Sequence, residues 1–212
     1  MCFSLSAQKI IDLSGKWSFS IDRQDNGEKE KWFSHTLNDC INLPGSMPEK
    51  LKGDEVTAKT QWTGSLYDSS YYYNPYMEKY RKEGNIKFPF FLTPDKHYVG
   101  AAWYQKEVNI PADWKGERIL LFLERPHIET TVWVNGQKTG MQNSLCVPHQ
   151  YDITRYVRPG KCTITIRVDN RIKEINVGPD SHSITDQTQG NWNGIVGRIC
   201  LQTTPKTYFD DI

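Results

Sequence analysis

The sequence has almost no net charge and no long apolar segment. Its 26 lysines and arginines are balanced by 25 aspartates and glutamates, which leaves a formal net charge of +1. Nucleic-acid binding needs a clustered basic surface, so this balance argues against a nucleic-acid partner and gives no reason to expect an acidic membrane surface as partner. No run of about 18 apolar residues occurs, and the sequence therefore predicts no membrane-spanning helix.

Closely spaced metal ligands are also missing. The cysteines are far apart without a Cys-x-x-Cys pair, and three histidines are scattered without ligand spacing: Cys2, Cys40, Cys146, Cys162 and Cys200, with His97, His127 and His149. We therefore expect no metal site and no cofactor. Free thiols that pack as small apolar groups in the core are the simplest interpretation of these cysteines.

Sustained helical periodicity and repeated β-α-β units are absent, which argues against a parallel sheet. Short segments of alternating apolar and polar residues are instead separated by turn residues, as in a β-sandwich or barrel. The clearest segments are 17–22, 102–110, 119–123, 131–134, 163–168 and 197–202. Asn135-Gly136 is a strong two-residue hairpin signal because both residues tolerate positive φ. The length of 212 residues suits one all-β domain.

A long connection at about residues 46–100 interrupts this rhythm and is rich in Tyr, Gly, Pro and Lys. Long ordered connections are uncommon in compact domains and often functional. Sugars stack their apolar faces on Trp and Tyr rings, so Trp62, Tyr71 and Tyr72 are candidate substrate-binding residues. The alternative is a loop that packs on its own sandwich or on another domain.

The N-terminal residues 1–8 are short and apolar and end near the small residues Ser6 and Ala7. This pattern predicts the remnant of a secretory signal peptide with cleavage after Ala7, and hence a periplasmic or extracellular protein. An ordinary N-terminus, compatible with a cytoplasmic protein, is the alternative. Residues 9–212 are then expected to form a single β-sandwich domain that includes the long aromatic loop.

Three motifs in a fixed order carry a resemblance to a known family. They are residues 13–19 (LSGKWSF), residues 132–140 (VWVNGQKTG) and residues 190–199 (GNWNGIVGRI). This order resembles the sugar-binding domain of family 2 glycoside hydrolases, which include β-galactosidases, β-glucuronidases and β-mannosidases. The resemblance extends from about Asp12 to about Thr204. It implies a jelly-roll β-sandwich that is similar to galactose-binding domains.

The resemblance also implies a role as the non-catalytic N-terminal domain of a retaining glycosidase. In that family the two catalytic carboxylates lie in a separate (β/α)₈ barrel, and this sequence lacks the β-α repeats of such a barrel. We therefore expect no catalytic residue in this chain and no hydrolysis by this chain alone. The implied partners are a β-glycoside and the downstream sandwich and barrel of the same protein.

In several members of the family the loop before the last strand contributes to the active site of the barrel. The corresponding residues here are 181–193, and their candidate sugar-binding side chains are Asp186, Gln189, Asn191 and Asn193. Such side chains offer fixed donors and acceptors to sugar hydroxyls. The galactosidase-like pattern places an aspartate just before the tryptophan, where this sequence has Asn191, so contact with galactose or a cation is not implied. A purely structural turn at 189–193 is the alternative.

Two other functions fit the same sequence. An autonomous carbohydrate-binding module would hold a glycan with the aromatic loop, without a catalytic domain. A purely structural sandwich would only mediate packing between domains.

Overall fold

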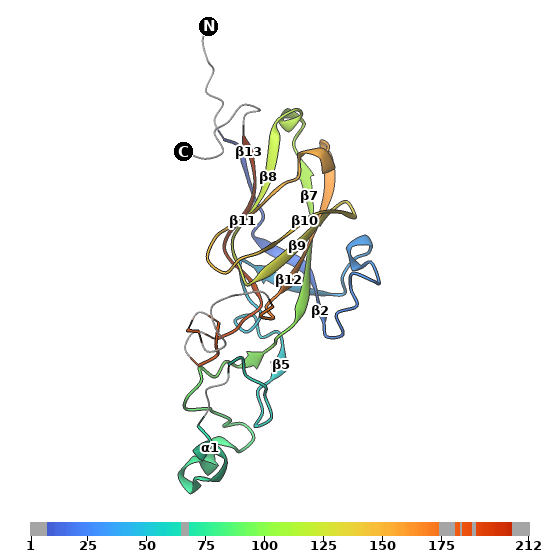
Figure 1. The fold of residues 1–212 in the computed structure, drawn as a ribbon. Coiled ribbons are helices and arrows are strands. Elements are labelled where there is room, and N and C mark those ends of the chain that lie inside the picture. The colour runs from blue at the N-terminus through green and yellow to red at the C-terminus, as the bar shows by residue number, and fades with distance from the viewer. Residues whose placement is uncertain (1–7, 65–67, 174–180, 183, 188–189, 205–212) are drawn as a thin grey trace.

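The computed structural model describes residues 8–64, 68–173, 181–182, 184–187 and 190–204. In this part of the chain two antiparallel sheets pack face to face (Figure 1). The first sheet has the order β1-β13-β8-β11, and β4 also pairs with β13. Its strands are β1 (Ile10–Asp12), β13 (Gly194–Thr204), β8 (Arg118–Pro126), β11 (His149–Asp152) and β4 (Gly45–Ser46).

The second sheet has six strands in the order β10-β9-β12-β7-β2-β3. They are β10 (Gln137–Asn143), β9 (Glu129–Val134), β12 (Gly160–Asp169), β7 (Ala101–Ile110), β2 (Gly15–Asp22) and β3 (Asp39–Leu43). All the strand pairs are antiparallel, so the predicted all-β sandwich is confirmed.

The alternating segments of the sequence form strands because one side of each strand can be buried. In β12, Ile164, Ile166 and Val168 point into the space between the sheets and are completely buried. Asn135 and Gly136 join β9 to β10 with φ angles of 49° and 77°. Positive φ at both residues matches the twist of the flanking strands, and the predicted hairpin is confirmed.

The core between the sheets consists of large apolar side chains from both layers. Strand β2 contributes Trp17 and Phe19, and the indole N–H of Trp17 donates to the carbonyl of Leu13 at 2.8 Å. Strand β8 contributes Leu121 and Leu123 from the opposite sheet. The indole is therefore buried with its polar atom satisfied, as a stable core requires.

The outer face of the six-stranded sheet is also covered. Trp103 of β7 and Trp133 of β9 stack with their ring centroids 4.9 Å apart, and Phe33 stacks on Trp133 at 5.2 Å. Leu37 is buried in the same cluster, and Trp32 packs against it. The segment after β2 therefore buries a second, smaller apolar cluster on the far side of the sheet, which is why β12 is buried on both faces.

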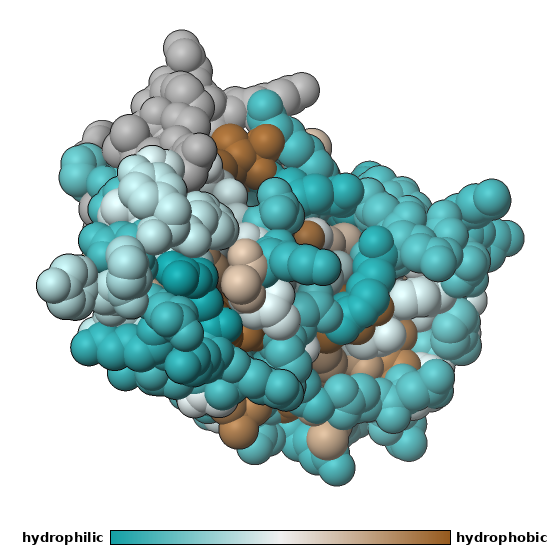
Figure 2. Space-filling model, turned by 90° about the horizontal axis from the view of Figure 1, so that it is seen from below, coloured by the Kyte–Doolittle hydropathy of each residue, from teal (hydrophilic) through white to brown (hydrophobic). Residues whose placement is uncertain are grey.

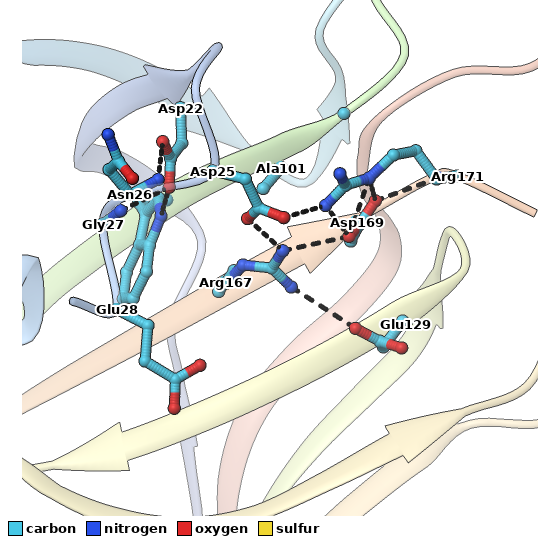
Figure 3. A network of polar contacts seen from close by, with 12 residues as sticks. Asp22, Asp25, Asn26, Gly27, Glu28, Ala101, Glu129, Arg167, Asp169 and Arg171 are labelled. Carbon is cyan, nitrogen blue, oxygen red and sulfur yellow. Dashed lines mark hydrogen bonds and ion pairs between the residues drawn. The ribbon is translucent and has the colours of Figure 1, made fainter. Parts of the chain in front are cut away.

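A network of charged side chains lies beside this second cluster, on β12 and β9 (Figure 3). The Arg167 guanidinium contacts Asp25 at 2.6 Å, Asp169 at 3.0 Å and Glu129 at 3.3 Å. Arg171 also binds Asp25 and Asp169. Every buried charge in this group has an opposite charge in contact, so the network ties the turn after β2 to the sheet instead of leaving an open ligand site.

Strand β10 forms one edge of the six-stranded sheet. Its pairing with β9 is interrupted by a register shift between Lys138 and Gly140. The edge is therefore irregular, and Lys138 lies on it, where its ammonium group binds Glu28 at 2.8 Å.

A separate lobe, residues 54–64 and 68–97, projects from one end of the sandwich (Figure 1), the end from which Figure 2 is viewed. Pairing of β5 (Asp54–Glu55) with β6 (Lys96–His97) closes its base. The lobe contains α1 (Ser70–Tyr73) and η2 (Pro75–Tyr80); the other short helices are η1 (Trp32–Ser34), η3 (Ala112–Trp114) and η4 (Thr154–Tyr156). The lobe lies within the long aromatic loop that the sequence predicted at about 46–100.

Candidate functional site

Asp186 joins the lobe to the loop before β13. Its carboxylate accepts hydrogen bonds from the backbone N–H groups of Thr63 and Asn191, each at 2.6 Å, and Nε2 of His97 lies 3.2 Å from it. The Asp186 N–H donates to the carbonyl of Thr63, and its own carbonyl accepts from Leu92. Asp186 is only 1% exposed. This predicted sugar-binding residue therefore uses its carboxylate to hold two segments of the chain together.

Asn193 has an internal role of the same kind. Its amide nitrogen donates to the carbonyls of Gly100 at 2.8 Å and Val168 at 3.0 Å, and its oxygen accepts from the Tyr104 hydroxyl at 2.7 Å. Burial raises the pKa of Tyr104 well above its usual value, so the phenol remains a donor. Asn193 is completely buried and faces the sandwich, so it orients β13 without reaching a surface.

Asn191 differs because part of its side chain is unused. Its amide nitrogen donates to the Thr63 hydroxyl and to the Asn170 carbonyl, both at 3.0 Å. Its carbonyl oxygen is buried and makes no hydrogen bond of regular geometry among the described residues, although the side chain lies close enough to His127 to raise the pKa of that imidazole. Of the four loop candidates, Asn191 is thus the one with an incompletely used acceptor oxygen among the described residues. Gln189 lies outside the described residues.

The aromatic candidates of the lobe separate into two groups. The rings of Trp62 and Tyr71 pack against Phe88, with centroids 5.1 Å and 4.5 Å away, and Tyr71 is completely buried. The Tyr71 hydroxyl donates to the carbonyl of Tyr80. Tyr72 is 54% exposed on α1. Trp62 and Tyr71 therefore form the small core of the lobe, and only Tyr72 presents its ring to solvent.

Trp192 and His127 are functional candidates that reasoning from sequence did not select. Their rings stack with centroids 4.5 Å apart and an interplanar angle of 19°. Burial lowers the pKa of His127 to about 4, and the neighbouring Asn191 opposes this with a smaller effect. The imidazole is therefore neutral near pH 7. Trp192 was visible as part of the third motif, but no local pattern connects it with a histidine 65 positions earlier.

Two hollows are lined by Trp192. The first hollow has a volume of about 320 Å³ and is bounded by Leu92 of the lobe, Ser46 of β4, and the loop residues Asp186, Asn191 and Trp192. The second hollow has a volume of about 450 Å³ and is bounded by the end of β8, the connection at 145–148 and Trp192. Both volumes lie in the range of ordinary ligand sites.

Unpaired polar atoms gather around the Asp186 junction. In the described part of the chain, five buried side-chain atoms lack a hydrogen-bond partner, and four belong to residues in or next to this junction: Trp62, His127, Thr185 and Asn191. Each such atom costs about 1–3 kcal/mol when it stays unpaired. Proteins keep few such atoms, so their concentration at this junction marks a part of the chain whose polar groups are incompletely satisfied.

The other predicted features of the site concern metals, thiols and membranes. Within the described residues, no group of three or more His, Cys, Asp and Glu side chains could hold a metal ion. Cys40, Cys146, Cys162 and Cys200 are free, but only Cys162 and Cys200 are buried, so the expectation of core thiols is wrong for Cys40 and Cys146. Cys2 lies outside the described residues. No described helix is long and apolar enough to cross a membrane.

The described residues thus form an antiparallel sandwich whose loops create a polar junction at one end. The family described as "Glycosyl hydrolases family 2, sugar binding domain" matches residues 10–205. The chain therefore belongs to this family, and the resemblance seen in the sequence is confirmed.

Several relatives of this chain carry the name β-glucuronidase. The Paenibacillus borealis protein is 27% identical over 164 residues, which cover 77% of this chain and 21% of the relative. The human protein is 25% identical over 234 residues, which cover 97% of this chain and 30% of the relative. A solved β-glucuronidase from an uncultured Clostridium species superposes with a TM-score of 0.62 at 21% identity, over 97% of this chain and 31% of that one. The chain thus spans less than a third of each of these relatives.

Proposed function

We propose that this chain is the non-catalytic sugar-binding domain of a larger retaining β-glycosidase that acts on β-glucuronides. The Asp186 junction is the observation that carries the proposal, because it fixes Asn191 and Trp192 at one end of the sandwich beside a hollow of about 320 Å³. The relatives named β-glucuronidase, of which the chain covers about a third or less, support the substrate class.

The proposed division of labour follows from the chemistry of the two parts. Retaining glycosidases break the bond with two carboxylates about 5 Å apart, and the family places them in a barrel that is the proposed partner of this sandwich. The first hollow would form one wall of the substrate entrance. The unpaired oxygen of Asn191 would accept a hydrogen bond from a sugar hydroxyl, and the Trp192 ring would exclude water beside it.

Rigidity is what this domain would add to catalysis. A loop residue positions substrate well only when its own geometry is fixed by surrounding contacts. Asp186 provides this by binding the N–H of Asn191 from one side and the N–H of Thr63 from the other. The lobe would therefore hold the loop before β13 in a fixed position while the sugar binds.

The test is a kinetic comparison in the longer protein. Asn191→Ala should raise KM for p-nitrophenyl β-D-glucuronide about tenfold, the loss expected for one hydrogen bond to a sugar. Asn109→Ala, which changes an exposed asparagine of β7, should leave KM and kcat unchanged. An unchanged KM for Asn191→Ala would contradict the proposed role, and a preference for the β-galactoside would contradict the substrate class.

The alternative of an autonomous carbohydrate-binding module rests on a smaller set of residues than the sequence indicated. Trp62 and Tyr71 are packed inside the lobe, whereas Tyr72 is exposed beside Tyr73 and Tyr76, which are 72% and 85% exposed. Glycan binding by the chain that disappears with Tyr76→Ala would favour this function. Loss of binding with Trp62→Ala would not discriminate, because that change removes the core of the lobe.

Export of the protein stays a prediction from residues 1–8, of which 1–7 lie outside the described residues. We propose a periplasmic or extracellular location, where plant or host glycans are accessible to a secreted glycosidase. Fractionation of cells that produce the longer protein, followed by N-terminal sequencing, tests this directly. Cleavage after Ala7 is the expected result, and an intact cytoplasmic protein would contradict it.

A further inference from the structure

The second hollow brings together three side chains with complementary chemistry. Arg125 and His127 come from the end of β8, and Trp192 comes from the loop before β13. Cys146 and Pro148 also line the hollow. These residues are far apart in the sequence, so the hollow exists only because β8 and β13 pair at this end of the sheet.

Arg125 is exceptional among the arginines of the described residues. Each of the other eight has an acidic group, a carbonyl, a hydroxyl or an aromatic ring in contact with its guanidinium: Arg23, Arg81, Arg118, Arg155, Arg158, Arg167, Arg171 and Arg198. Arg125 has no such contact in that part of the chain and is exposed at the rim of the hollow. A guanidinium group can donate two parallel N–H hydrogen bonds to the two oxygens of a carboxylate.

The floor of the hollow suits a sugar ring. His127 is buried and lies next to Asn191, so its imidazole forms part of the wall behind the hollow and does not face a ligand. The Trp192 ring, supported from behind by His127, provides a flat apolar surface of the kind on which sugar rings stack. A sugar ring that carries a carboxylate would therefore contact both Trp192 and Arg125.

Two carboxylates near the hollow, those of Glu124 and Asp186, accept hydrogen bonds from backbone N–H groups. Glu124 also lines it, but its carboxylate accepts a hydrogen bond from the backbone N–H of Arg198 at 2.8 Å. Asp186, whose charge also acts on His127, binds the N–H groups of Thr63 and Asn191. Among the described residues that line the hollow, Arg125 is thus the one with a permanent positive charge, while Glu124 keeps its negative charge.

We propose that the second hollow is a binding site for a hexuronate unit of an acidic oligosaccharide. Arg125 binds the carboxylate, and Trp192 lies under the sugar ring, held in place by the His127 ring behind it. This site deepens the proposed function and rests on it for its biological meaning, because a protein that acts on glucuronides meets acidic glycans.

The experiment is a titration of the ¹⁵N-labelled chain, followed by the indole N–H resonance of Trp192. Trp192→Phe assigns that resonance among the seven tryptophans. Methyl β-D-glucuronide should shift it in a saturable way, with an affinity at least tenfold higher than methyl β-D-glucoside or acetate. Arg125→Gln should weaken glucuronide binding at least tenfold and leave glucoside binding unchanged. Arg155→Gln, at η4 beside the opposite end of β8, is the matched control and should have no effect.

Three results would overturn the proposal. They are the absence of a Trp192 shift, equal affinity for glucuronide and glucoside, and acetate binding as tight as glucuronide binding. The titration needs only this chain, whereas the proposed function is tested by Asn191→Ala in the longer protein. Failure of one experiment can therefore be told apart from failure of the other.

Discussion

Removal of the Asp186 carboxylate should detach the loop from the lobe without unfolding the sandwich. Asp186→Ala deletes the acceptor for two backbone N–H groups, those of Thr63 and Asn191. A hydrogen bond to a charged group contributes about 1.5–3 kcal/mol, and each buried N–H left unpaired adds a cost of its own. We therefore expect a loss of about 3–5 kcal/mol, confined to the junction.

The size of this loss sets the expected signal in hydrogen exchange. A local destabilisation of about 3–5 kcal/mol accelerates exchange by roughly two to three and a half orders of magnitude, since 1.4 kcal/mol is a factor of ten. The amides of Thr63 and Asn191 should show it, whereas the amide of Ile166 in the centre of β12 should exchange as before. Nuclear magnetic resonance resolves these amides individually.

Asp12→Ala is the matched control for this change. Asp12 also accepts from a backbone N–H, that of Ser14 at 2.9 Å, but in an exposed position. Its removal should cost less than about 1 kcal/mol because water replaces the lost acceptor. Unchanged protection of Thr63 and Asn191 in Asp186→Ala would refute the reasoning, and so would an equal loss in β12, since the junction would then not be a local unit.

Three further predictions follow from burial and charge. Burial lowers the pKa of His127 from 6.5 to about 4 in the folded protein. The unfolded chain therefore binds a proton more readily between these pH values, and the free energy of unfolding should fall by about 3 kcal/mol as the pH drops from 6.5 to 4. Urea unfolding of His127→Phe should not show that decrease. Burial raises the pKa of Asp169, but hydrogen bonds from Arg171 and its neighbours outweigh this and hold it below its usual value. The contribution of Asp169 to the free energy of unfolding should therefore be lost only as the pH falls below about 4. Asp169→Asn should remove that acid dependence in the same assay, and it should lower the free energy of unfolding by about 3–5 kcal/mol at pH 7. Tyr71→Ala should destabilise the lobe by about 3–5 kcal/mol and expose it to limited proteolysis, whereas Tyr76→Ala, which is 85% exposed, should change neither.

The strands could be predicted because their signal is local. Alternation in segments such as 163–168 depends only on which side chains of the strand point between the two sheets, and Asn135-Gly136 specifies its hairpin by backbone geometry alone. Exposed thiols such as Cys146 were missed because composition alone does not reveal which cysteines face solvent.

The site could be located but not oriented from the sequence. The resemblance pointed to the loop at 181–193, and polar residues in a loop are naturally expected to face a ligand. Asp186 instead meets Thr63, 123 positions away, and no local pattern encodes such a partner. The same applies to His127, whose significance depends on the ring of Trp192.

The irregular edge formed by β10 has a consequence for how this domain behaves beside copies of itself. A regular edge strand offers a row of free backbone groups to any other strand, and two sandwiches can join through such edges into larger aggregates. The register shift between Lys138 and Gly140 interrupts that row, and the lysine would have to give up its solvent and its ion pair to admit a second strand. The six-stranded sheet therefore ends at a boundary that discourages self-association, so that crowded copies of this domain stay separate at this edge.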